Sequence, residues 1–322
     1  MGVALTGADH QPRVVVLMST YAGERFIAEQ LESILAQLPA NGLLMVRDDG
    51  SPDGTVRAVQ ACGDERIQLT EGKNLGFGAS FLSLLMQAPA DADLVLFADQ
   101  DDVWLPGKLD RAWQSLAPMG STPGLYGGAK QLVDEALRPL GVSPPWPRPP
   151  SFQNALVENV ITGCTAAINR AALNLLQRAG VAEGVYFHDW WLYLVISAHG
   201  RVVFDDTPML LYRQHGANQI GQGAGFVARQ AGMVQFLLRR DWAGILLAQV
   251  AALMRHYEAS LSTEQLALVL QHFHLHENRA LPRWRMLLGL HRWRQFLAHE
   301  AALRLLLLLR RLQVWPPSAR RV

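Results

Sequence analysis

The sequence Asp-Leu-Val-Leu-Phe-Ala-Asp-Gln-Asp-Asp at residues 93–102 joins an apolar run to an acidic cluster. The apolar run is typical of a parallel strand that is buried on both faces. Asp99, Asp101 and Asp102 then place three carboxylates within four residues, where they repel one another unless a cation compensates them. A hard divalent ion, Mg²⁺ or Mn²⁺, that bridges the phosphates of a nucleotide is the usual compensation. The alternative is a solvated acidic turn.

The residues before this stretch alternate between strand and helix patterns. Strands are predicted at residues 13–18, 43–47, 66–70 and 93–98, and helices at residues 24–37, 55–62 and 78–87. Alternating strands and helices with short links are typical of a doubly wound α/β sheet. Ligands of such sheets bind beyond the carboxyl ends of the strands, where both acidic clusters (residues 48–49 and 99–102) fall.

The second half of the chain changes character twice. Six prolines between residues 139 and 150 exclude a helix or a central strand, so we expect an exposed loop that flanks a cleft. Beyond it we expect a short strand leading into a helix at 163–176, a helix at 188–198 and a strand at 201–205. Long Leu/Ala/Arg segments with helical periodicity follow. We therefore expect an α/β domain at residues 12–225 and a helical, Arg/Leu-rich region at residues 226–322.

Charge and cysteine content limit the class of protein. The 322 residues carry a formal net charge of +1, which argues against a nucleic-acid binder. Cys62 and Cys164 form no zinc or disulfide pattern, so we expect a reducing, cytoplasmic location. No run approaches the ~20 apolar residues that span a bilayer.

The charge is unevenly distributed along the chain. Residues 279–322 hold ten arginines and a single acidic residue, Glu300, together with three tryptophans and a short apolar helix pattern. This combination suits an anionic membrane surface, and we expect peripheral association with the inner face of the plasma membrane. The alternative is a helix that packs on the domain or on a partner.

Three further segments carry candidate chemistry. Asp48 and Asp49 precede a Gly-Ser turn, where a carboxylate can accept a hydrogen bond from a base or a ribose. Asp189, between His188 and Trp190, is a candidate general base, because burial beside aromatic rings raises the pKa of a carboxyl group; capping of the helix is the alternative. Arg213 and His215 offer a guanidinium and an imidazole for a phosphate or a metal.

Together these segments resemble the family 2 inverting glycosyltransferases of the GT-A fold, and within them the bacterial rhamnosyltransferase-like branch. The matching motifs are Ser-Thr-Tyr at 19–21, Arg-Asp-Asp-Gly-Ser at 47–51, Ala-Asp-Gln-Asp-Asp-Val-Trp at 98–104, His-Asp-Trp at 188–190 and Tyr-Arg-Gln-His at 212–215. They occur in this order over residues 13–221. Ala22 departs from the family, where asparagine is usual.

The resemblance implies a role for each motif. The nucleotide pocket would comprise Ser19, Tyr21, Glu24, Asp49 and Gln100, with Asp49 bonded to the pyrimidine base. Asp99 and Asp101 would hold the metal and the diphosphate, and Asp189 would deprotonate the acceptor hydroxyl. Contacts with the leaving diphosphate or the acceptor would come from Arg213, His215, His188 and Trp190, with aromatic stacking on the acceptor side.

The resemblance also implies partners. The expected donor is dTDP-L-rhamnose, with UDP-hexoses left open, and the expected acceptor is a cell-surface glycan or a lipid-linked glycan. One alternative is a nucleotidyltransferase, for which a Gly- and Lys-rich loop would follow the first strand. Residues 19–24 contain no lysine and one glycine. The other alternative is a catalytically silent sugar-nucleotide-binding or scaffold protein.

Overall fold

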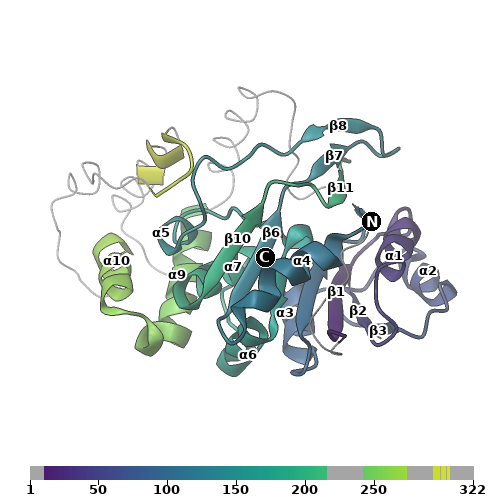
Figure 1. Cartoon of the computed structure of the whole chain (residues 1–322), viewed down its shortest axis with the longest axis horizontal. Helices are drawn as coiled ribbons and strands as arrows, with labels where there is room; N and C mark the ends of the chain where they lie inside the picture. The colour runs from purple at the N-terminus through teal and green to yellow at the C-terminus, as the bar shows by residue number, and fades with distance from the viewer. Residues whose placement is uncertain (1–10, 216–241, 274–292, 298, 302, 305–322) are drawn as a thin grey trace.

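The structure is a computed structural model that describes residues 11–215, 242–273, 293–297, 299–301 and 303–304 (Figure 1). Its main sheet contains seven strands: β1 (Val14–Thr20), β2 (Leu43–Asp48), β3 (Ile67–Glu71), β4 (Leu94–Ala98), β6 (Gly124–Gly128), β9 (Ala167–Asn169) and β10 (Arg201–Asp205). A second sheet contains β5 (Val103–Trp104), β7 (Gln131–Val133), β8 (Pro139–Val142) and β11 (Leu210–Arg213). The expected α/β architecture with a doubly wound mixed sheet is confirmed.

The helices connect these strands. They are α1 (Ile27–Leu35), α2 (Thr55–Ala61), α3 (Phe77–Gln87), α4 (Lys108–Leu116), α5 (Phe152–Ala155), α6 (Arg170–Ala179), α7 (His188–His199), α9 (Trp242–Tyr257) and α10 (Thr263–Phe273). Single 3₁₀ turns occur at Ala117–Met119, Gly163–Thr165 and Glu258–Ser260.

The main sheet has the strand order β10-β6-β9-β4-β1-β2-β3. Neighbouring strands are parallel except at β9, which runs antiparallel to both β4 and β6. The carboxyl ends of β1, β2 and β4 therefore lie side by side at one edge of the sheet. The acidic segments that follow β2 and β4 meet at this edge.

Both faces of the main sheet are covered, which explains the continuous apolar pattern of its central strands. Val15 and Leu17 of β1 pack in one buried cluster with residues of α3, α6 and α7, whereas Val14, Val16 and Met18 pack in a second cluster with α1 and α4. Successive side chains of a strand point to opposite faces, so a strand with helices on both sides is apolar at every position.

The second sheet lies over the carboxyl edge of the first and is built from very short strands. Within it β5 pairs antiparallel with β11, β11 pairs parallel with β7, and β7 pairs antiparallel with β8. The proline-rich segment was expected to be a loop throughout, but its first four residues form β8. This strand is exposed at every residue and lies at the end of the sheet, a position that tolerates Pro139.

The C-terminal helices pack on the α/β fold. Trp242 of α9 stacks on Trp190 of α7 with ring centroids 4.9 Å apart, and Leu246 and Leu253 join the same buried cluster. The expected domain boundary near residue 225 lies outside the described residues, as do most of the arginine-rich residues 279–322. None of the helices in the described ranges is long and apolar enough to cross a membrane.

Candidate active site

The acidic segment after β4 meets the end of β11 at the carboxyl edge of the main sheet. Pairing of Val103 with Leu211 in the second sheet brings the two segments together. As a result, Nε2 of His215 lies 2.7 Å from Oδ2 of Asp101. The His215 ring also stacks on Phe26, with centroids 5.2 Å apart, which fixes its plane. Sequence-distant residues thus form one polar cluster.

Asp99 and Asp102 complete this cluster at its buried end. Burial, followed by the charges of Asp101 and Asp189, raises the pKa of Asp99 to about 7. Burial raises the pKa of Asp102 well above its ordinary value, and Oδ2 of Asp102 has no hydrogen-bond partner within the described residues. Ligand atoms of Asp99, Asp102 and Cys164 all lie within 4.8 Å of one another.

The donor set fits a divalent cation. Asp99 and Asp101 offer carboxylate oxygens and His215 offers an imidazole nitrogen, all on partly buried side chains at the sheet edge. Mg²⁺ and Mn²⁺ prefer such hard oxygen ligands, and Mn²⁺ also accepts imidazole. After burial, the charges of Asp101 and Asp189 contribute to the raised pKa of Asp99, and a cation would offset this repulsion.

Two buried lysines lie beside this cluster, and the sequence analysis assigned no role to either. Lys130 Nζ donates to Thr162 Oγ1 at 2.8 Å and lies 4.6 Å from the centroid of the Tyr212 ring. Its charge lowers the pKa of Asp99 and of Asp189. Lys108 Nζ donates to the Cys164 carbonyl, and burial lowers its pKa to about 8. The available signal was their rarity, because the chain has only three lysines.

Asp189 lies at the start of α7 and faces the same cluster. Its Oδ2 accepts a hydrogen bond from the backbone N–H of Gly163 at 3.0 Å, and its Oδ1 accepts one from the N–H of Trp190 at 2.7 Å. Burial raises its pKa to about 6, although these bonds, Asn159 and Lys130 oppose the shift. The residue as a whole is partly exposed.

The predicted nucleotide-binding residues come together beside the acidic cluster. The loop after β1 is bound to the loop after β4, because Gln100 Oε1 accepts from the N–H of Tyr21 at 2.8 Å and Gln100 Nε2 donates to its carbonyl at 2.9 Å. Glu24 accepts from the N–H of Gly54 at 2.9 Å, and Ser19 Oγ donates to Ser80 Oγ at 2.7 Å. The Tyr21 side chain remains 49% exposed and offers a free aromatic face.

Asp49 is already occupied by protein donors. Its carboxylate pairs with Arg47 and accepts the backbone N–H groups of Leu75, at 2.9 Å, and Gly76, at 2.8 Å. These bonds hold the 75–76 loop on the end of β2. The N–H group of a pyrimidine base would therefore have to compete with these donors for an oxygen of Asp49.

Ala22 has a positive φ of 51°. Asparagine adopts this left-handed region more readily than other residues with a Cβ. The residue that the family usually has here thus suits the backbone, and alanine keeps the same conformation without an amide side chain.

Arg213 lies at the site, and its guanidinium is bound by neighbouring protein groups. Its buried guanidinium donates to the carbonyl of Asp101 at 2.8 Å, to the carbonyl of Glu135 and to the carboxylate of Glu29. These contacts connect the loop after β4 to α1 and to the β7–β8 turn. The geometry therefore argues against the predicted direct contact between Arg213 and the diphosphate.

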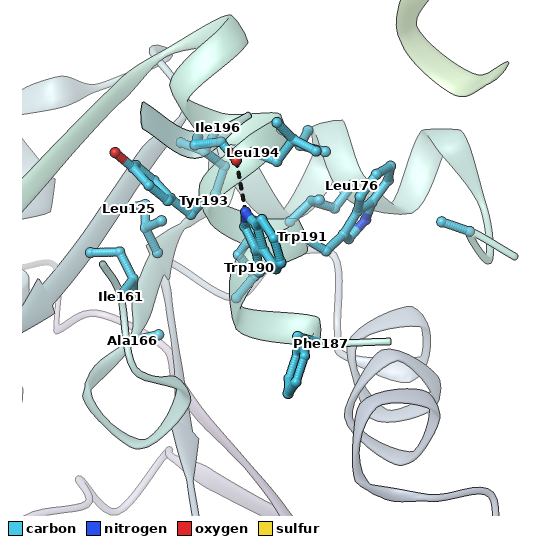
Figure 2. Close-up of a cluster of buried hydrophobic side chains, with 14 of the residues drawn as sticks. Leu125, Ile161, Ala166, Leu176, Phe187, Trp190, Trp191, Tyr193, Leu194 and Ile196 are labelled. Atoms are coloured by element: carbon cyan, nitrogen blue, oxygen red, sulfur yellow. Dashed lines mark hydrogen bonds between the residues drawn. The ribbon is translucent and has the colours of Figure 1, made fainter. Parts of the chain in front are cut away.

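The prediction that Trp190 stacks on the acceptor does not agree with its position. Its side chain is 1% exposed, its Nε1 donates to the carbonyl of Ala155 at 2.7 Å, and it lies in the cluster drawn in Figure 2. His188, 4% exposed, stacks on Phe81 with centroids 4.1 Å apart, and burial lowers its pKa to about 3. A side chain enclosed by core residues presents no face to a sugar, so neither residue contacts substrate in this arrangement.

Comparison with known proteins identifies sequence relatives of the chain. A sequence model described as "Glycosyl transferase family 2" matches residues 15–174. The dTDP-rhamnosyl transferase RfbG of Shigella flexneri is 27% identical over 249 residues, which cover 70% of this chain and 80% of that protein. An Escherichia coli UDP-Glc:alpha-D-GlcNAc-diphosphoundecaprenol beta-1,3-glucosyltransferase, WfgD, is 27% identical over 184 residues, or 57% of this chain and 69% of that protein.

Among solved structures, the mannosyltransferase PcManGT from Pyrobaculum calidifontis, in complex with GDP-Man and Mn²⁺, superposes with a TM-score of 0.52. It is 18% identical, and the match covers 96% of this chain and 89% of that chain. This likeness shows a fold of the GT-A class. The chain belongs to glycosyl transferase family 2.

Proposed function

We propose that this enzyme transfers L-rhamnose from dTDP-L-rhamnose to a hydroxyl group of a cell-surface glycan or lipid-linked acceptor, with inversion at the anomeric carbon. The relative that matches the largest share of the chain among those described above is named a dTDP-rhamnosyl transferase. WfgD is named for a UDP-Glc donor, so UDP-hexoses are the competing donors that the experiment must include. The observation that carries the proposal is the meeting of Asp99, Asp101, His215 and Asp189 at one edge of the sheet.

The donor would bind across the carboxyl ends of β1, β2 and β4. The exposed ring of Tyr21 is the surface on which the base stacks, while Gln100 and Glu24 hold the surrounding loops in place. Asp49 and Ser19 lie deeper. Asp49 already accepts bonds from the 75–76 loop, and it would accept a further bond from the base on the same carboxylate. Loops that are already held in place would orient the sugar without a large ordering cost.

The diphosphate would lie over Asp99, Asp101 and His215, which hold Mg²⁺ or Mn²⁺. The bound cation offsets the negative charge that builds up on the departing nucleoside diphosphate. His215 contributes an imidazole nitrogen, and its contact with Asp101 orients that carboxylate. We assign Arg213 to the support of this loop, because its buried guanidinium already contacts Asp101, Glu135 and Glu29.

Asp189 would act as the general base. Its carboxylate takes the proton of the acceptor hydroxyl while the hydroxyl oxygen attacks the anomeric carbon from the face opposite the diphosphate. A pKa of about 6 suits this task, since the group is ionised at neutral pH and is more basic than an ordinary aspartate. The N–H groups of Gly163 and Trp190 fix both carboxylate oxygens.

The arginine-rich C-terminal residues would bring the enzyme to its lipid-linked acceptor at the inner face of the plasma membrane. Residues 305–322 contain four arginines and no acidic residue. Arginine near anionic lipids contributes about 1 kcal/mol per residue to membrane binding. Removal of residues 305–322 should therefore reduce binding to vesicles that contain anionic lipid, and unchanged binding would refute this role.

The experiment for the proposed function is a transfer assay with dTDP-L-rhamnose, UDP-glucose, UDP-galactose and UDP-N-acetylglucosamine, each with and without Mn²⁺. Asp189→Asn is the matched variant, because it keeps the size of the side chain and removes the basic carboxylate. Wild-type transfer of one sugar that needs Mn²⁺ and is lost in Asp189→Asn supports the proposal. Undiminished transfer by Asp189→Asn would refute the role of Asp189.

A further inference from the structure

A buried carboxylate outside the acidic edge joins the C-terminal residues to the α/β fold. Glu158 is 5% exposed and accepts hydrogen bonds from Asn154 Nδ2 at 3.0 Å, from Arg294 Nη2 at 3.2 Å and from the N–H of Gln295 at 2.7 Å. His299 Nδ1 lies 3.9 Å away. These partners lower the pKa of Glu158, although burial opposes the shift. The carboxylate is therefore held in its charged form.

Most of the partners of Glu158 come from one short piece of chain. We call residues 293–300 the C-terminal anchor; it lies outside the residues 15–174 that match the family. The two ends of this segment are joined, because the carboxylate of Glu300 accepts the N–H groups of Trp293, at 3.1 Å, and Arg294, at 2.8 Å. A buried charge that loses its partners is strongly unfavourable. The C-terminal anchor is thus part of the folded structure around Glu158.

The C-terminal anchor also holds the segment that contains α5. Asn154 Nδ2 donates to the carbonyl of Trp293 at 2.8 Å. The side-chain amide of Gln295 accepts the N–H of Arg148 at 2.9 Å through its oxygen and donates to the Arg148 carbonyl at 3.1 Å through its nitrogen. In Figure 1 the yellow C-terminal ribbon lies beside α5. The segment from residue 148 to residue 158 is therefore bound along one side by the C-terminal anchor.

The other side of this segment is bound to α7, the helix that carries Asp189. Tyr193 OH donates to Asn154 Oδ1 at 3.0 Å, and Trp190 Nε1 donates to the carbonyl of Ala155 at 2.7 Å. The residue after Glu158 completes the connection. Asn159 Oδ1 accepts the N–H of Ile161 at 3.0 Å, and Asn159 lowers the pKa of Asp189.

We infer that the C-terminal anchor positions the catalytic base, because it holds residues 148–158 in place. This segment in turn binds Trp190 and Tyr193 of α7, the helix that carries Asp189. The inference rests on the proposed function, since it takes Asp189 as the base. Asn159 and Glu158 are positioning residues: neither takes part in the reaction, and both determine where the Asp189 carboxylate points.

Several charged and titratable groups face Asp189, and a change in any of them would alter the pKa of Asp189. His188 lies beside it on α7, Asp99 faces it from the end of β4, and Lys130 faces it from the β6–β7 connection. None of these residues is changed in the test. Asn159 lowers the pKa of Asp189, so its loss should raise the pKa of the base and move the acid limb of the kcat profile to higher pH.

The test compares Asn159→Ala and Glu158→Gln with wild type in the full-length enzyme. Each variant should lower kcat at neutral pH by about tenfold or more, since a misplaced base loses much of its effect. The acid limb should move upward in pH, and the affinity for dTDP or UDP, measured by titration calorimetry, should stay within about twofold. Asp205→Asn is the control: Asp205 is paired with Arg111 away from the base, so that variant should lose thermal stability with an unchanged pH profile.

If Glu158→Gln does not fold, the double variant Glu158→Gln/Arg294→Met removes both charges and leaves no uncompensated buried ion. It should show the same loss of kcat and the same shifted profile. Wild-type kcat and a wild-type pH profile in these variants, measured below their melting temperatures, would overturn the inference. Turnover retained by Asp189→Asn would instead overturn the proposed function, so the two failures are distinguishable.

Discussion

His215 Nε2 lies 2.7 Å from Asp101 Oδ2, although 114 residues separate them in the sequence. The short second sheet produces this contact, because β5 directly follows the acidic segment and pairs with β11, which ends two residues before His215. The end of the site that would hold the metal is therefore assembled from two distant parts of the chain.

Replacement of His215 by alanine should weaken the metal site without unfolding the protein. We expect kcat to fall by about 10- to 100-fold and the Mn²⁺ concentration for half-maximal activity to rise, because both a nitrogen ligand and the orientation of Asp101 are lost. His199→Ala is the control, since His199 lies at the far end of α7 and bonds to Val195 and Ser260. An unchanged Mn²⁺ requirement in His215→Ala would exclude the role in metal binding.

The acid limb of the transfer rate should reflect the ionisation of Asp189. The base works only when deprotonated, and its pKa is raised to about 6, so kcat should rise with pH and level off above about pH 7. The check is a kcat profile at saturating donor and acceptor. A limb near pH 4, the range of an ordinary aspartate, would show that the environment of Asp189 does not raise its pKa.

The raised pKa of Asp189 should also make the free energy of unfolding depend on pH. Because the folded pKa of Asp189 is higher than its ordinary value of 3.8, its stabilising contribution is full below about pH 4 and is lost as pH rises through 6. The free energy of unfolding of wild type, relative to that of Asp189→Asn, should fall by about 2–3 kcal/mol between pH 4 and pH 8. Denaturant unfolding at several pH values measures this difference, and a constant difference would contradict it.

Gly163 should not tolerate a side chain. A Cβ at this position would lie 2.7 Å from Nε2 of the enclosed His188 ring and 3.6 Å from Cβ of Asp189. We expect Gly163→Ala to displace the start of α7 and lower kcat by about 10-fold or more. Gly128→Ala is the matched control, because a Cβ there meets only ordinary contacts, the nearest at 3.4 Å. Equal activities of the two variants would contradict this expectation.

Trp190→Phe distinguishes a structural from an acceptor-binding tryptophan. The variant loses the bond from Nε1 to the carbonyl of Ala155 and part of the stacking on Trp242. Its free energy of unfolding should therefore be lower by about 1–3 kcal/mol. The KM for acceptor should not change, because the side chain is enclosed. A raised acceptor KM at unchanged stability would restore the stacking role.

Much of the α/β fold was predictable because its strands are buried on both faces. Residues 14–18 and 94–98 are apolar throughout, and the structure places β1 and β4 there. The second sheet was missed for the opposite reason. Its strands have two to four residues, too few for a periodic pattern, and β8 begins with proline.

The site was predictable where residues adjoin a strand end and unpredictable where the contact depends on packing. Asp99 and Asp101 follow an apolar strand, so their position was readable from the sequence. Whether an aromatic residue is exposed or enclosed is decided by helices far along the chain: α9 covers Trp190. Likewise, nothing local to Lys130 indicates that it lies beside Asp99.

The most direct test of the account is calorimetric titration of wild type and Asp101→Ala with dTDP-L-rhamnose and the three UDP-sugars, with and without Mn²⁺. We expect wild type to bind one donor at least about tenfold more tightly with Mn²⁺, and Asp101→Ala to lose that dependence. Donor binding that ignores Mn²⁺ and is identical in the two proteins would contradict a metal-held diphosphate at the end of β4.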